Sequence, residues 1–91
     1  MGVKIRIPNV LQDKANGVTL AVVKGKTVHD CFEALIKQFP SLEGQLMDTQ
    51  GVLLPKWMLY VNHRSVGYKN ELFSPVEDGN LIELLPVLSG G

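Results

Sequence analysis

The residues with the clearest chemical potential close the sequence, which ends in Leu85-Pro86-Val87-Leu88-Ser89-Gly90-Gly91. Glycine is about 7% of average composition, so two glycines end a chain by chance only about once in two hundred sequences. Because glycine has no Cβ, a Gly90-Gly91 end can thread a narrow channel and leave its last carbonyl open to a nucleophile. Activation of the Gly91 carboxylate beside a nucleotide α-phosphate is the chemistry that this ending suits.

Pro86 separates that ending from the strand before it. Proline has no N–H to donate, so we expect sheet pairing to end at Pro86 and a flexible tail to run over 86–91. The six residues reach roughly 20 Å when extended, which is enough to enter another protein's pocket. Val87 and Leu88 have little chain left to cover them, and we expect them to bind a partner rather than to pack back on the domain edge. The predicted partner-binding set is Leu81, Leu85, Pro86, Val87, Leu88 and Ser89.

The last predicted strand, 81–85, presents two alternative faces. Leu81, Glu83 and Leu85 share one parity, and Ile82 and Leu84 share the other. If the second pair faces the core, Leu81 and Leu85 join Val87 in an outward apolar surface that Glu83 interrupts. Parity alone also allows a loop or the 41–56 segment to cover that surface.

Other catalytic constellations are absent from the sequence. No glycines fall at phosphate-loop or dinucleotide spacing, and no Gly-x-Ser-x-Gly elbow is present. Cys31, His29 and His63 are the only soft ligands, too few for a closed metal site. We expect His29 to face solvent on the helix and His63 to stand in a turn, and we assign neither a role. Cys31 lies on an apolar helix face, where an inert buried thiol is the default, although a place in the first helical turn can lower a thiol pKa. We therefore expect a protein that is not itself an enzyme and holds no metal or cofactor.

Composition narrows the class of partner. The 91 residues carry nine Lys plus Arg and nine Asp plus Glu, so the formal net charge is zero. Nucleic-acid binding and polybasic membrane attachment both depend on an excess of positive charge, so neither is expected. A single cysteine favours a reducing compartment, and the longest apolar run is too short to span a bilayer. A cytoplasmic protein is the resulting expectation.

The remaining pattern predicts one small domain over 1–91. Val3, Ile5 and Ile7 alternate with basic residues as in a half-buried strand. A second strand is predicted over 18–24, after a polar loop at 12–17 that ends in an Asn-Gly turn.

Apolar residues then recur at helical spacing over 28–39, from a Thr27 N-cap to Pro40. Asp30, three residues after Thr27, stands at the position of the acid in a capping box. The 41–56 segment is less regular, although Leu42 and Leu46-Met47 could dock a short helical turn. Strands follow at 57–61, near Val66 and at 81–85, with a turn over 62–65, a connecting loop over 68–75 and a turn at 78–79.

One helix covers only one face of such a sheet. The simplest packing lays the 28–39 helix across a mixed sheet of four or five strands, with the first and last strands parallel at its centre. This α+β arrangement is the ubiquitin-like β-grasp. The chain end then leaves a central strand.

The segments Leu46-Met47-Asp48, Tyr60-Val61-Asn62, Glu77-Asp78-Gly79 and 85–91 together resemble the ThiS/MoaD-type sulfur carriers. The resemblance implies activation by a ubiquitin-activating-type adenylyltransferase that uses ATP. It further implies conversion of the Gly91 carboxylate to a thiocarboxylate, whose sulfur passes to an acceptor enzyme.

The resemblance is strongest to carriers for cysteine or homocysteine formation, whose acceptor would be a pyridoxal-phosphate-dependent, cysteine-synthase-like enzyme. The small subunit of molybdopterin synthase, which works with the large subunit, is second, and the shorter thiamine-pathway carriers are third. A ubiquitin-like modifier that forms amides with lysines needs the same tail and remains an alternative.

Overall fold

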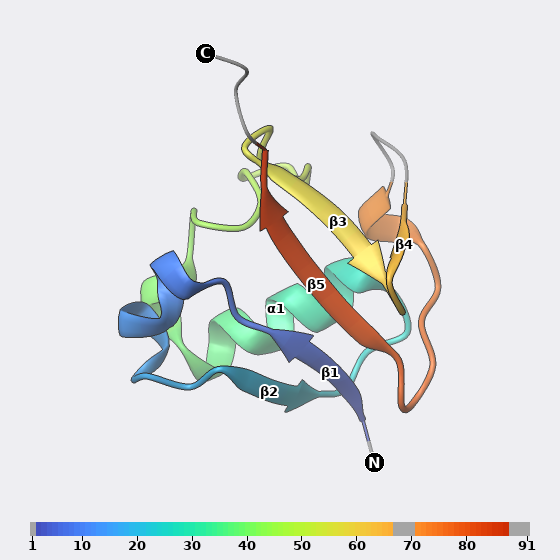
Figure 1. Ribbon diagram of the computed structural model, residues 1–91, viewed down its shortest axis with the longest axis horizontal. Coiled ribbons are helices and arrows are strands. Elements are labelled where there is room, and N and C mark those ends of the chain that lie inside the picture. Colours follow the sequence, from blue (N-terminus) through green and yellow to red (C-terminus); the bar gives the residue numbers. More distant parts are fainter. Residues whose placement is uncertain (1, 67–70, 88–91) are drawn as a thin grey trace.

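The computed structural model describes residues 2–66 and 71–87, which form one five-stranded sheet with a helix across one face (Figure 1). The strands are β1 (Val3–Arg6), β2 (Leu20–Val23), β3 (Trp57–Val61), β4 (Arg64–Ser65) and β5 (Leu81–Pro86). The helix is α1 (Val28–Gln38), and three 3₁₀ segments are η1 (Asn9–Ala15), η2 (Pro40–Leu42) and η3 (Glu71–Phe73).

The strand order is β2-β1-β5-β3-β4. β1 and β5 run parallel at the centre, and the other neighbours are antiparallel. In Figure 1, α1 crosses behind the sheet and β5 points toward the C-terminal end of the chain. The β-grasp topology predicted from the sequence is confirmed.

The core lies between α1 and the sheet face turned toward it. Phe32 and Leu35 of α1 are almost fully buried, as are Ile5 of β1 and Ile82 of β5. Trp57 is buried at the start of β3, and its Nε1–H donates to the carbonyl of Gln45 at 2.8 Å. This bond satisfies the polar end of the indole and joins the 41–56 segment to the sheet.

Capping fixes where α1 begins. Thr27 is extended, and its Oγ1 accepts a 3.1 Å hydrogen bond from the N–H of Asp30, as an N-cap should. The Asp30 carboxylate reaches back to the N–H of Lys26 at 3.3 Å, one residue before the cap itself. The predicted capping pair is therefore present in a slightly shifted form, and the charge of Asp30 lies at the positive end of the helix dipole.

The expectation of a polar loop over 12–17 is wrong for most of that range. η1 extends to Ala15, and Leu11 and Ala15 are buried beneath its polar side chains. The predicted turn follows directly, because Asn16 and Gly17 both have positive φ.

Two other connections form as the sequence indicates. Leu42 and Leu46 of the 41–56 segment are fully buried. Gly79 has a φ of 89° in the turn before β5, a conformation that glycine adopts without strain. Part of the loop predicted over 68–75 forms η3, and 67–70 lie outside the described residues. Among the described helices, none has the length and apolar character required to cross a membrane.

Candidate functional site

The burial of the β5 side chains shows which face of this strand turns toward the helix. Ile82 and Leu84 are 0% and 3% exposed and face α1, so Leu81, Glu83 and Leu85 face the open side of the sheet. Leu85 is 45% exposed, and Leu81 is half-buried. Of the two arrangements that parity allowed, the outward apolar surface is the one that forms at the end of β5.

That surface includes a residue from the neighbouring strand. Met58 of β3 lies directly opposite Leu85 in the antiparallel register, and both side chains stand on the open face. Val87 follows at 45% exposure, opposite Lys56 in the same register. We call Met58, Leu85 and Val87 the exit patch, because the chain leaves the sheet beside them. Met58 is not among the contact residues predicted from the sequence, although the alternation of buried Trp57 and Leu59 around it carried the signal.

Pairing at the exit continues one residue further than predicted. Pro86 lies opposite Trp57 within β5, and the N–H of Val87 donates to the carbonyl of Lys56 at 2.8 Å. The carbonyl of Leu81 likewise accepts from the N–H of Asn62. The N–H and C=O groups of the odd-numbered residues of β5 therefore face β3, because both groups of one residue point toward the same neighbour in an antiparallel ladder. The nitrogen of Pro86 therefore faces the β1 side, where pairing has already ended at Arg6 and Glu83. A proline on that side removes no bond from the ladder to β3.

A second proline ends the ladder from the β1 side. Lys4 donates to the carbonyl of Asn80, so even-numbered residues of β1 face β5, and the next donor after Arg6 would be the nitrogen of Pro8. Pro8 has none, and the chain turns away into η1. A groove of about 510 Å³ opens between η1 and the end of β5, with Val10 and Leu85 among its lining residues. Val10 is the most exposed large apolar side chain of the described residues, at 70%.

Glu83 occupies the centre of the open face with two basic partners. Its Oε2 lies 3.1 Å from Nε of Arg6 on β1, and its Oε1 lies 3.1 Å from Nδ1 of His63. His63 stands in the turn between β3 and β4, where it and Asn62 both have positive φ, as in the tight turns that suit β-hairpins. The sequence predicted this turn but gave His63 no role, because the contact depends on the pairing of β3 with β5.

Cys31 is fully buried on α1, as predicted. Burial, with a smaller contribution from the Asp30 charge, raises the pKa of its thiol from 9.0 to about 11. The thiolate is the nucleophilic form, so the native fold holds Cys31 in its unreactive state at neutral pH. The alternative of a thiol activated by the first helical turn is wrong.

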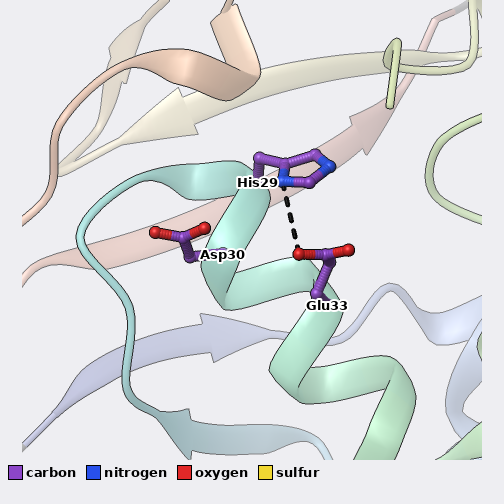
Figure 2. Close-up of side chains that lie close together, drawn as sticks. All are labelled: His29, Asp30 and Glu33. Carbon is purple, nitrogen blue, oxygen red and sulfur yellow. Dashed lines mark ion pairs between the residues drawn. The ribbon is translucent and has the colours of Figure 1, made fainter. Parts of the chain in front are cut away.

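His29, Asp30 and Glu33 form a cluster of side chains whose atoms could bind a metal ion, and Figure 2 shows them on the first turns of α1. One potential ligand atom of each of the three residues lies within 4.8 Å of the others. The Nδ1 of His29 lies 3.5 Å from Oε1 of Glu33, an i,i+4 pair. The His29 ring stacks on Phe73 at 5.7 Å between centroids and adjoins Gly51. The histidine expected to face solvent is thus partly enclosed, with its side chain 23% exposed. These contacts join α1 to η3 and to the 41–56 segment.

Of the predicted site residues, the structure brings Leu85, Pro86 and Val87 together at the exit of β5, while Leu81 stands at the strand's other end. Leu88, Ser89, Gly90 and Gly91 lie outside the described residues. The last described backbone hydrogen bond before them is that of Val87 to Lys56.

The family assignment comes from a match that runs through this exit. The ThiS family model matches residues 5–91, from β1 to the final glycine. The chain belongs to the ThiS family. A match of this extent includes the exit patch and the terminal Gly90-Gly91 of this ThiS-family chain.

Individual relatives are similar over their full length. The chain is 27% identical to the sulfur carrier protein CysO of Mycobacterium tuberculosis over 93 residues, covering 100% of both chains. The structure of the Amycolatopsis orientalis BexX/CysO complex includes a chain that matches with a TM-score of 0.87 and 26% identity, covering 99% of this chain and 100% of that one. Small archaeal modifier protein 1 of Methanosarcina acetivorans has a TM-score of 0.80 at 22% identity, covering 98% and 95%, a likeness in fold alone.

Proposed function

We propose that this ThiS-family chain is a sulfur carrier whose Gly91 carboxylate is the group that carries the sulfur. The observation that supports it most is the continuity of β5 with the glycine pair. β5 is held on both sides at the centre of the sheet, and the sequence runs for four residues beyond Val87 to Gly91. A rigid base and a terminus without side chains suit a group on which another enzyme acts.

The chemistry proposed for Gly91 has two steps. A carboxylate oxygen of Gly91 attacks the α-phosphorus of ATP, and pyrophosphate leaves to give an acyl adenylate. Hydrosulfide then attacks the carbonyl carbon, and AMP leaves with the oxygen that it received, so the product is a thiocarboxylate and a proton is released. An adenylyltransferase partner supplies ATP binding and the sulfur source, and the carrier itself catalyses neither step.

The exit patch is the proposed contact surface for that enzyme. Met58, Leu85 and Val87 are each between 39% and 45% exposed and lie beside the point where the tail begins. Exposed apolar side chains gathered on one face are typical of interfaces. A partner that buries them draws the tail toward its own nucleotide site.

Cysteine or homocysteine formation is the proposed pathway, because the sequence resembles the carriers of that pathway most strongly. The full-length similarity to the sulfur carrier protein CysO fits this choice. The acceptor would then be a pyridoxal-phosphate-dependent, cysteine-synthase-like enzyme. The small subunit of molybdopterin synthase and a lysine-conjugated modifier use the same tail chemistry up to the acyl adenylate.

Co-expression with the cognate adenylyltransferase and a sulfide source tests the proposal. The intact mass of the carrier should rise by one oxygen-to-sulfur exchange. A variant lacking Gly91 should show no such rise and should melt at the same temperature as the parent. An unchanged parent mass would contradict the proposal, and conjugates on other proteins would show a modifier instead.

A further inference from the structure

The outer edge of β2 is the second surface of this molecule with unused binding capacity. β2 stands at one end of the sheet order, at the lower edge of Figure 1, and none of the described residues pairs with its outer side. Ile7 donates to the carbonyl of Thr19, so odd-numbered residues of β2 face β1 in the antiparallel ladder. The N–H and C=O groups of Leu20, Val22 and Lys24 therefore point outward.

The side chains beside that edge are apolar and exposed. Leu20 and Val22 are 41% and 59% exposed and stand on the open face of the sheet, while Ala21 and Val23 are buried beneath them. An added strand would gain backbone bonds from the edge and apolar contact from these two side chains.

Charge selects what kind of strand can add there. The segments 3–7 and 19–26 contain Lys4, Arg6, Lys24 and Lys26 and no acidic residue, although the whole chain has zero net charge. Arg6 is paired with Glu83, and the ion pairs among the described residues include none of the three lysines. All three are exposed.

We propose that the β2 edge binds an extended, acidic segment of a partner protein by β-strand addition. Lysines on an edge strand also oppose pairing with a second copy of the same chain, because two such edges would bring like charges together. An acidic strand meets no such repulsion. β2 is separated from β5 by β1, so this partner could bind while the exit patch is occupied.

A pair of synthetic peptides tests the proposal without any enzyme. One alternates valine and threonine and carries glutamates at both ends, and the other replaces the glutamates with lysines. In amide NMR spectra of the whole chain, the glutamate peptide should shift and protect the outward amides of Leu20, Val22 and Lys24. The lysine peptide should leave them unchanged.

Matched variants separate the contribution of charge to binding from that of the backbone hydrogen bonds. Lys24→Glu with Lys26→Glu should weaken binding by about tenfold at low salt, because complementary charge is lost. Lys14→Glu with Lys37→Glu changes the net charge equally at other places and should leave binding unaltered. Val22→Pro removes one outward donor and no bond to β1, so it should also weaken binding.

Three outcomes would overturn the proposal. These are equal binding of the two peptides, shifts centred on Met58, Leu85 and Val87, and protection of the β2 amides that grows with protein concentration alone. The last would show pairing between two copies. Because no carrier chemistry is involved, failure here is distinct from failure of the sulfur-carrier function.

Discussion

Leu85 and Met58 face each other across the β5–β3 ladder, and both side chains remain exposed, at 45% and 39%. Directly opposed apolar pairs of this kind contribute roughly 0.2–1 kcal/mol to a sheet, so the pair is of modest value to the isolated fold. Because the pair lies beside the exit of the chain, we expect it to contribute more to the binding of a partner than to the stability of the fold.

Leu85→Asp should therefore impair activation more than stability. We expect the KM of the adenylyltransferase for the carrier to rise by about ten- to a hundredfold, as for a central interface residue, with kcat changed much less. Steady-state pyrophosphate release measures both constants. Val22→Asp is the matched control, because Val22 is 59% exposed and stands on β2, which β1 separates from β5. Equal effects of the two changes would argue against the exit patch as the contact surface.

Phe32 should dominate the stability of the core. Its side chain is 0% exposed on α1, so Phe32→Ala should lower the free energy of unfolding by about 3–5 kcal/mol. Phe73→Ala removes the same atoms from a side chain that is 59% exposed and touches the His29 ring, and should cost under about 1 kcal/mol. Urea denaturation followed by tryptophan fluorescence gives both values. Similar losses would mean that the core is not centred on α1.

The start of α1 should depend on the Thr27 hydroxyl. Thr27→Ala removes the acceptor for the Asp30 N–H and should destabilise the fold by about 1 kcal/mol. Thr49→Ala, in an exposed loop, is the comparison and should lie within about 0.5 kcal/mol of the parent in urea denaturation. Loss of stability in the second variant alone would contradict the capping assignment.

The buried thiol of Cys31 should make the free energy of unfolding fall in alkaline solution. Its thiol pKa is about 11 in the folded chain against 9.0 as the ordinary value, so between these two pH values the unfolded chain binds fewer protons than the folded one. Stability must then fall as pH rises through this window, and below pH 9.0 the group has no effect. Denaturation at several pH values should show the fall in the parent. Cys31→Ala should lack that component, and an identical pH profile in both would contradict it.

The parts of the fold that the sequence predicted are those set by short-range pattern. The apolar spacing of α1, its Thr27 cap and the alternation in β1 and β5 each specify one buried face, and each forms as expected. The parallel pairing of β1 with β5 followed from the need of one helix to cover one sheet.

The errors have physical causes of longer range. The pattern predicts a loop in place of η1 because residues 12–14 are polar and only Leu11 and Ala15 are apolar around them. These two side chains become buried through contacts with the rest of the fold, including η2, which the local pattern does not show. Pairing at Val87 depends on which side of β5 its N–H faces, and that is set by the register with β3. His29 contacts Phe73, and His63 contacts Glu83. Each partner is far away in the sequence, so residue spacing does not indicate these contacts.

The central claim is that sulfur is carried on the carbonyl carbon of Gly91, and fragment mass spectrometry of the sulfurated chain tests it most directly. The purified carrier is treated with its adenylyltransferase, ATP and sulfide, digested, and sequenced by fragmentation. The oxygen-to-sulfur exchange should be found on the C-terminal residue alone. Sulfur added to Cys31, or a C-terminal peptide of unchanged mass in a chain that has gained sulfur, would contradict the account.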